Sequence, residues 1–178
     1  MKKIVLIGIP NAGKSTLGRL AANALQLPFF DTDTLIFEKM EFTRRSDIFR
    51  MGNGELFLKL QQEVVEKLVE LDNSAIIATG AETALAPECA KLLKKIGTII
   101  HIHREYDIVL AGFKNTIKSG FYRKEEDGTL VPMQGDILGL YMKEMDHYNV
   151  LADLTLENNG TEEEGLDKLI YLIKQQVD

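Results

Sequence analysis

Two patterns of apolar residues alternate along the 178-residue chain. Short apolar runs rich in β-branched residues are typical of strands that are buried on both faces of a sheet. They predict strands at residues 3–7, 28–30, 74–79, 98–102 and 154–156. Longer segments with apolar residues three and four positions apart predict helices at residues 14–25, 35–40, 55–71, 84–95, 106–118, 136–148 and 162–176. Strands alternating with helices form a parallel sheet covered on both faces, so we predict one α/β domain over residues 1–178 with five strands.

Residues 120–135 fit neither pattern. The segment is polar, includes the charged run Arg123-Lys124-Glu125-Glu126-Asp127, and shows no period. A segment of that length without secondary structure of its own is a functional lid or is disordered.

The junction between the first predicted strand and the first predicted helix carries the pattern Gly-x-x-x-x-Gly-Lys-Ser, from Gly8 to Ser15. Glycines let the backbone curl so that several N–H groups point at phosphate oxygens, and the helix N-terminus adds a partial positive charge. The strand–loop–helix setting is the one that this motif requires, which disfavours a chance match. The pattern therefore predicts a nucleoside triphosphate site. The residues expected to bind the nucleotide are Gly8, Asn11, Ala12, Gly13, Lys14, Ser15 and Thr16.

Two side chains of this loop have specific expected roles. Lys14 reaches the β- and γ-phosphates, and the Ser15 hydroxyl is placed to bind Mg²⁺. The predicted cofactors are therefore ATP and Mg²⁺.

Two carboxylates, Asp31 and Asp33, follow the second predicted strand. Ligands of an open parallel sheet bind at the carboxyl ends of the strands, so both side chains should lie beside the phosphate loop. One can hold Mg²⁺ through water, and the other can accept a proton from an attacking hydroxyl. The alternative is that one of them caps the helix near Leu35, which leaves its neighbour to act.

Composition and charge narrow the partners. The net charge of −6, without a strong basic stripe, disfavours nucleic acid. No apolar run is long enough to cross a bilayer, and the apolar start of the chain is too short for a signal peptide. We expect a cytoplasmic monomer with no membrane partner. The single cysteine, Cys89, lies in an apolar helical pattern, which favours a packed hydrophobe over a nucleophile.

Several segments together resemble the shikimate kinases. Residues 8–16, 18–21 and 27–33 follow the opening of that family closely. Residues 46–49, 54–55, 76–80 and 148–153 follow it more loosely, so the resemblance spans about the whole chain.

The resemblance implies a three-layer P-loop kinase fold, in which a five-stranded parallel sheet is flanked by helices. It implies a substrate-binding helical segment at about residues 33–62 and a lid at about residues 119–135. It implies transfer of the γ-phosphoryl of ATP, with Mg²⁺, to a small-molecule hydroxyl acceptor, a ring hydroxyl of shikimate. Lys14 would contact the phosphates, Ser15 and Asp31 would bind Mg²⁺, and Asp33 would contact the substrate hydroxyl.

The departures from the family fall where the substrate should bind. The family has an arginine after a phenylalanine where this chain has Leu58-Lys59, and Gly-Gly-Gly where it has Gly80-Ala81-Glu82. It also has an arginine shortly before Tyr148, where residues 144–147 read Glu-Met-Asp-His.

In the family these groups grip the shikimate carboxylate, and lysine is not an equal replacement for a bidentate arginine. We expect Lys59, Gly80, Ala81 and Glu82 to lie at the substrate. Glu82 would repel a carboxylate, so the acceptor stays open between shikimate, the best named candidate, and a neutral or cationic polyol-like molecule. Arg44 and Arg45 either replace the missing arginines or are solvated.

The lid arginine that would neutralise charge in the transition state is assigned to Arg123. The lid sequence of the family, Arg-Pro-Leu-Leu, is absent, so a solvated, charge-mixed loop is the alternative. His101 and His103 alternate on a predicted strand without a third ligand nearby, which disfavours a metal site.

Two other classes of function compete with a kinase. A nucleotide-binding regulatory protein with a degenerate acceptor site would not need the second acid, so the presence of both Asp31 and Asp33 argues against it. A hydrolysing P-loop NTPase is disfavoured because the strand at residues 75–78 ends without an acid. The chain also lacks an Asn-Lys-x-Asp guanine-binding motif.

Overall fold

A five-stranded parallel sheet forms the centre of the computed structural model, which describes residues 3–40, 54–115, 122–124, 130–132 and 134–176. The strand order is β2-β3-β1-β4-β7, and every pairing in it is parallel. The strands are β1 (Lys3–Ile7), β2 (Phe29–Asp31), β3 (Ile76–Ala78), β4 (Gly97–His103) and β7 (Leu154–Glu157). The predicted α/β class and the five parallel strands are confirmed.

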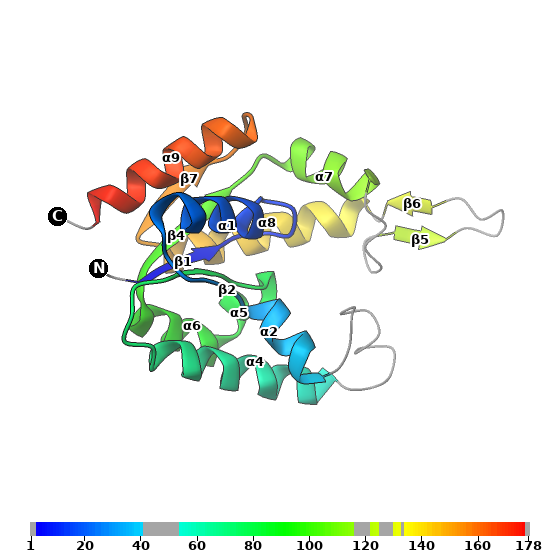
Figure 1. Cartoon of the computed structure of the whole chain (residues 1–178). Helices are drawn as coiled ribbons and strands as arrows, with labels where there is room; N and C mark the ends of the chain where they lie inside the picture. Colours follow the sequence, from blue (N-terminus) through cyan, green and yellow to red (C-terminus); the bar gives the residue numbers. More distant parts are fainter. Residues whose placement is uncertain (1–2, 41–53, 116–121, 125–129, 133, 177–178) are drawn as a thin grey trace.

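Helices cover both faces of this sheet (Figure 1). They are α1 (Lys14–Leu25), α2 (Thr32–Met40), α4 (Gly54–Val69), α5 (Ala81–Leu85), α6 (Pro87–Ile96), α7 (Tyr106–Asn115), α8 (Gln134–Leu151) and α9 (Glu162–Gln175). Helices α1 and α9 pack together on one face, and α4 and α6 pack together on the other. Among the described residues, no helix combines the length and the apolar character needed to cross a bilayer.

The core follows from the apolar pattern of the sequence. The side chains from Ile4 to Ile7 in β1 are at most 2% exposed because this strand lies between β3 and β4, with helices on both faces. Helix α1 closes on the sheet at Gly18, where an added Cβ would lie 2.8 Å from the ring of Phe29. A capping box between Thr161 and Glu164 begins α9, whose apolar stripe is buried.

Several element boundaries differ from the prediction. Helix α2 begins at Thr32, three residues before the expected start. The helix expected over residues 84–95 is two helices, because the chain is extended at Ala86 before Pro87, which starts α6 at a position where a missing N–H is tolerated. The expected helix at residues 106–118 is described only as far as Asn115.

The segment without a period contains two short strands. Strand β5 (Tyr122–Lys124) pairs antiparallel with β6 (Leu130–Pro132), and Arg123 lies opposite Val131. This pair projects from the molecule beyond α7 and α8 (Figure 1). Three-residue strands are too short for their alternation to be recognised in a sequence, so the prediction of an irregular segment was wrong here. The side chain of Arg123 and the whole of Arg44 and Arg45 lie outside the described residues.

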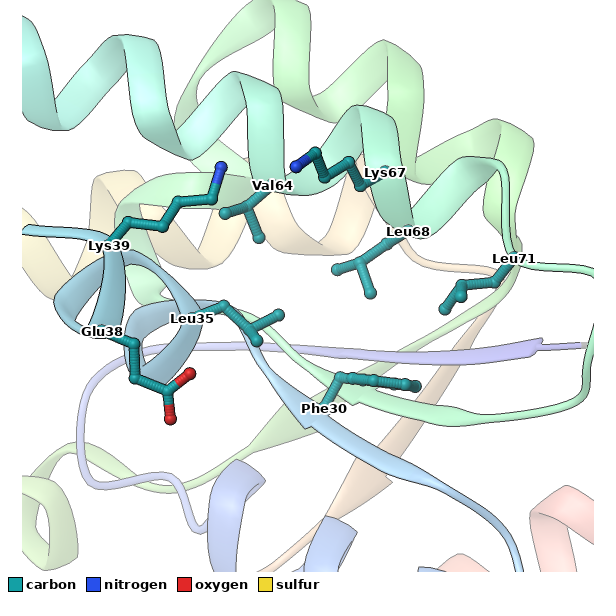
Figure 2. A pocket seen from close by; sticks show the side chains of 8 residues that line it. All are labelled: Phe30, Leu35, Glu38, Lys39, Val64, Lys67, Leu68 and Leu71. Atoms are coloured by element: carbon teal, nitrogen blue, oxygen red, sulfur yellow. The ribbon is translucent and has the colours of Figure 1, made fainter.

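An apolar cavity of about 410 Å³ lies between β2, α2 and α4 (Figure 2). Five apolar side chains line it, together with three charged ones: Phe30, Leu35, Val64, Leu68 and Leu71, and Glu38, Lys39 and Lys67. None of the site residues predicted from the sequence is among them.

Candidate active site

The phosphate loop connects β1 to α1 through three residues with positive φ. These are Gly8 (142°), Asn11 (65°) and Gly13 (98°). Glycine is favoured at position 8 by its positive φ. It is also required there because a Cβ would lie 2.6 Å from the carbonyl oxygen of Ile102. The left-handed positions curl the backbone as the motif predicts.

The N-terminus of α1 faces this loop without a side-chain cap. Gly13 is the N-cap residue and has no side chain with which to accept from the first-turn N–H groups. Lys14 is 7% exposed, and its ammonium donates to the carbonyl oxygens of Gly8 (2.7 Å) and Ile9 (2.9 Å). Helix N–H groups and an ammonium therefore converge at the loop, which is the chemistry that binds phosphate.

Asp31 connects the loop to α2. Its Oδ2 accepts a hydrogen bond from the Ser15 hydroxyl at 2.6 Å. Its Oδ1 accepts from the backbone N–H groups of Asp33 (3.1 Å) and Thr34 (3.3 Å), so Asp31 also caps the helix. Of the alternatives that the sequence left open, the helix cap is made by Oδ1 of Asp31, while its Oδ2 faces Ser15. A hydroxyl and a carboxylate oxygen this close suit Mg²⁺, which prefers oxygen ligands.

Asp33 lies in the first turn of α2, against Gly80 at the end of β3. A Cβ on Gly80 would lie 2.8 Å from Cγ of Asp33, so glycine makes room for the carboxylate. The Gly80 N–H donates to the hydroxyl of Thr32 at 2.8 Å, which fixes the two elements together. The structure thus brings Asp31, Asp33 and Gly80 to the carboxyl edge of the sheet, next to the phosphate loop.

A buried polar cluster behind Asp33 was not predicted. Gln61 of α4 is 1% exposed, and its Nε2 donates to Thr83 Oγ1 at 2.7 Å. Thr83 Oγ1 in turn lies 3.5 Å from Thr32 Oγ1. The Oε1 atom of Gln61 has no hydrogen-bond partner in the described part of the chain. The signal available in the sequence was three polar residues on otherwise buried helix faces.

Comparison with known proteins identifies the family. Residues 10–174 match the model of the family described as shikimate kinase. The chain belongs to the shikimate kinase family. It is 30% identical over 175 residues to the shikimate kinase of Clostridium botulinum (strain Alaska E43 / Type E3), covering 96% of each protein. It is 36% identical over 116 residues to that of Alkaliphilus oremlandii (strain OhILAs), covering 65% of this chain and 68% of the relative.

Solved structures show the same fold. The shikimate kinase from Acinetobacter baumannii in complex with shikimate has a TM-score of 0.81 at 21% identity, covering 100% of this chain and 96% of that one. A gluconokinase from Sinorhizobium meliloti 1021 has a TM-score of 0.63 at 15% identity, covering 99% and 94%. The predicted P-loop kinase fold is confirmed, and the chain is a phosphotransferase of the ATP-dependent, shikimate kinase type with a hydroxyl group as acceptor.

The residues expected at the acceptor of this shikimate kinase family member do not all lie together. Gly80 precedes α5, Ala81 is buried in its first turn, and Glu82 is exposed next to it. Lys59 is exposed on α4, two positions before the buried Gln61, so the two side chains lie on different faces of that helix. The structure places Gly80 against Asp33 and turns Lys59 away from the cluster around Gln61.

Glu144 of α8 is buried beside the same end of α5. It is 5% exposed, and its Oε2 lies 3.3 Å from the Tyr148 hydroxyl. That hydroxyl also lies 3.1 Å from the carbonyl oxygen of Ala81, so its one proton serves two acceptors. His147 Nε2 lies 3.0 Å from the carbonyl oxygen of Ala84. Helix α8 therefore places a carboxyl group near the start of α5, from the stretch before Tyr148 in which the resemblance implied an arginine.

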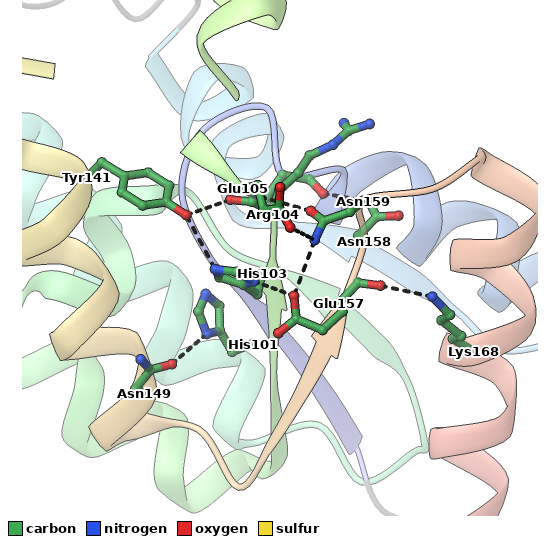
Figure 3. Close-up of polar contacts among 11 residues, drawn as sticks. His101, His103, Arg104, Glu105, Tyr141, Asn149, Glu157, Asn158, Asn159 and Lys168 are labelled. Carbon is green, nitrogen blue, oxygen red and sulfur yellow. Dashed lines mark hydrogen bonds and ion pairs between the residues drawn. The ribbon is translucent and has the colours of Figure 1, made fainter. Parts of the chain in front are cut away.

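The two strand histidines of this family member have protein partners (Figure 3). His101 is fully buried, its Nδ1 lies 3.2 Å from Asn149 Oδ1, and burial lowers the pKa of its imidazole to about 4. His103 lies between Glu157 Oε2 (2.5 Å from Nδ1) and the Tyr141 hydroxyl (3.3 Å from Nε2).

Cys89 is 2% exposed, as its apolar pattern predicted. Burial, with smaller contributions from Glu66 and Glu88, raises the pKa of its thiol to about 11. A protonated, buried thiol is a packing group and not a nucleophile.

Proposed function

We propose that the chain transfers the γ-phosphoryl group of ATP to a small-molecule hydroxyl, with Asp33 accepting the proton of that hydroxyl. The hydroxyl oxygen bonds to the γ-phosphorus, the bond from that phosphorus to the bridging oxygen of ADP breaks, and ADP leaves with the bond's electron pair. The observation that carries this proposal is the Ser15–Asp31 hydrogen bond, because the same carboxylate accepts from the backbone N–H of Asp33 and so ties the turn that carries Asp33 to the phosphate loop.

The loop residues have separate tasks in this proposal. The backbone from Gly8 to Gly13 and the first turn of α1 bind the phosphates. Lys14 exchanges the carbonyl oxygens of Gly8 and Ile9 for oxygens of the β- and γ-phosphates. Ser15 Oγ and Asp31 Oδ2 would hold Mg²⁺, which when bound neutralises charge on those phosphates.

We further propose that residues 1–178 act as one kinase domain, in which residues 33–62 bind the acceptor and residues 119–135 form the lid. The short β5–β6 pair, which projects from the body, supports the second assignment. Arg123 would balance negative charge in the transition state. Replacing Arg123 with Ala should lower turnover far more than ATP affinity, and unchanged turnover would remove the residue from the reaction.

Shikimate is the first acceptor to test, because the relatives by sequence are shikimate kinases. The experiment is ADP release from Mg·ATP in a coupled assay, with and without shikimate, alongside a direct measurement of ATP binding. Stimulation by shikimate, with shikimate phosphate found by mass spectrometry, supports this acceptor. ATP binding without stimulation by shikimate excludes it.

The acidic side chains of Glu82 and Glu144 near the start of α5 favour a second candidate, an acceptor without a carboxylate. Glu82 is exposed on α5, whose Ala81 carbonyl the Tyr148 hydroxyl contacts, and a carboxylate there would repel the carboxylate of an acceptor. The matched test is a panel of polyols that carry a carboxylate, an amine or neither. ADP release that only a neutral or amine-bearing polyol stimulates supports this candidate. ATP binding with no phosphorylated product from the whole panel supports a regulatory nucleotide-binding protein instead.

A further inference from the structure

Side chains from two other parts of the chain hold backbone carbonyls of the phosphate loop. Asn158, which follows β7, donates from Nδ2 to the carbonyl oxygen of Ala12 at 2.8 Å. Arg104, which follows β4, donates from Nη1 to the carbonyl oxygen of Asn11 at 3.2 Å. Both donors belong to one polar cluster at the carboxyl ends of β4 and β7 (Figure 3).

We propose that Asn158, assisted by Arg104, is a positioning residue for the phosphates of the nucleotide. In a planar trans peptide the C=O and the following N–H point in opposite directions. A side chain that holds a loop carbonyl on the outside therefore turns the next N–H to the inside. This inference rests on the proposed nucleotide-binding function.

The direction of one of these N–H groups can be followed in the structure. The carbonyl of Asn11 faces Arg104, and the N–H of the next residue, Ala12, donates to the carbonyl oxygen of Ile9 at 3.2 Å. The same Ile9 oxygen accepts from the Lys14 ammonium. The Ala12 N–H thus points to the side of the loop where Lys14 lies, which is the side expected to hold phosphate.

The neighbouring peptide obeys the same rule. The carbonyl of Ala12 is fixed on Asn158, so the N–H of Gly13 is turned the opposite way, toward the interior of the loop. Gly13 is also the N-cap residue of α1, where the helix adds its partial positive charge. Asn158 therefore orients an N–H that lies between the loop and the helix terminus.

The fit of the Asn158 side chain is close. It is 5% exposed, and a Cβ on Gly13 would lie 2.7 Å from its Nδ2. A Cβ on Gly165 of α9 would collide with its Oδ1. The backbone N–H of Asn158 donates to the carbonyl oxygen of His103 at 2.9 Å. The backbone and the side chain of Asn158 are therefore both held by hydrogen bonds. An aspartate here would place oxygen against oxygen.

The neighbouring Asn159 offers a matched control. Its Nδ2 donates to Glu105 Oε1 at 3.1 Å, and its Oδ1 accepts from the N–H of Glu105 at 2.9 Å. These bonds join the same two strand ends but do not involve the phosphate loop. Asn159→Ser therefore disturbs the hydrogen bonds between the ends of β4 and β7 and leaves the contacts to the phosphate loop intact.

The experiment compares Asn158→Ala, Asn158→Asp and Asn159→Ser in the full chain. ADP affinity is measured by calorimetry, adenosine affinity by ligand-observed NMR, and folding by thermal unfolding. We expect Asn158→Ala to weaken ADP binding roughly tenfold, the upper end for one hydrogen bond, and Asn158→Asp to weaken it more. Adenosine binding should not change, because adenosine has no phosphate. Asn159→Ser should bind ADP as the wild type does.

Two results would overturn the inference. One is ADP binding by folded Asn158→Ala at wild-type affinity, and the other is equal weakening of ADP and adenosine, which would indicate a general structural role. If neither Asn158 variant folds, Arg104→Gln, at a half-buried side chain, must weaken ADP selectively for the inference to stand. A wild-type protein that binds no ADP would refute the proposed function itself, which separates that failure from this one.

Discussion

The Ser15 hydroxyl lies 2.6 Å from Oδ2 of Asp31, whose Oδ1 caps α2 through the N–H groups of Asp33 and Thr34. One carboxylate therefore couples the phosphate loop to the first turn of the helix that carries Asp33. Any group that Ser15 and Asp31 hold together is placed at a fixed position relative to Asp33.

Asp31→Asn tests whether this pair binds Mg²⁺. Asparagine caps helices about as well as aspartate, so α2 should stay intact while the negative charge is lost. We expect the Mg²⁺ concentration for half-maximal MgADP binding to rise roughly ten- to a hundredfold, the range for disturbed metal sites. The exposed Asp72 provides the control variant Asp72→Asn. Equal Mg²⁺ dependence of the two variants would exclude Asp31 from the metal site.

Glu144→Gln tests whether this buried carboxyl group sets the acceptor preference. Glutamine keeps an acceptor for the Tyr148 hydroxyl and cannot ionise. We expect the KM for shikimate to fall about fivefold or more, the magnitude of one charge-dependent contact, with the KM for ATP unchanged. Steady-state kinetics at saturating ATP measure this. A variant whose KM for shikimate matches that of the wild type would show that Glu144 does not face the acceptor.

The folded protein should lose stability in mild acid because of His101. Burial lowers the pKa of its imidazole from 6.5 to about 4, so the unfolded state binds the proton more readily than the folded state. The contribution of the neutral imidazole to the free energy of unfolding is fully present above pH 6.5. It is lost as the pH falls toward 4, and the loss is about 3 kcal/mol at most. Urea unfolding at several pH values should show a smaller decline for His101→Phe than for the wild type. Parallel curves would contradict this.

Cys89 should resist alkylation in the folded protein. Burial raises the pKa of its thiol to about 11, so only about one molecule in a thousand is thiolate at pH 8, and the side chain is 2% exposed. Iodoacetamide should modify it in urea but not in buffer, as mass spectrometry can show. Modification of the native protein within minutes would mean that this region opens readily.

The sequence predicted the features that rest on local pattern. The runs at β1 and β4 are buried because both lie inside the sheet, and the Gly8–Ser15 motif can be recognised from adjacent residues alone. The positions of Asp31 and Asp33 followed from the rule that strand ends meet at one edge of a parallel sheet.

Features that rest on distant contacts were missed. The Gln61–Thr83 hydrogen bond joins α4 to α5, and the burial of Glu144 depends on how α8 meets α5. The loop contact of Asn158 joins residues 146 positions apart. No periodicity records such pairs, because each depends on how separate helices and loops come together.

The most direct test of the account compares wild-type protein with Asp33→Asn, using ATP labelled at the γ-phosphate and an acceptor that the wild type phosphorylates. Single-turnover transfer of label and ADP affinity are measured on the same preparations. If Asp33 is the general base, Asp33→Asn should lose transfer by about a hundredfold or more and should bind ADP like the wild type. Transfer at the wild-type rate by Asp33→Asn would contradict the assignment of Asp33 as the proton acceptor.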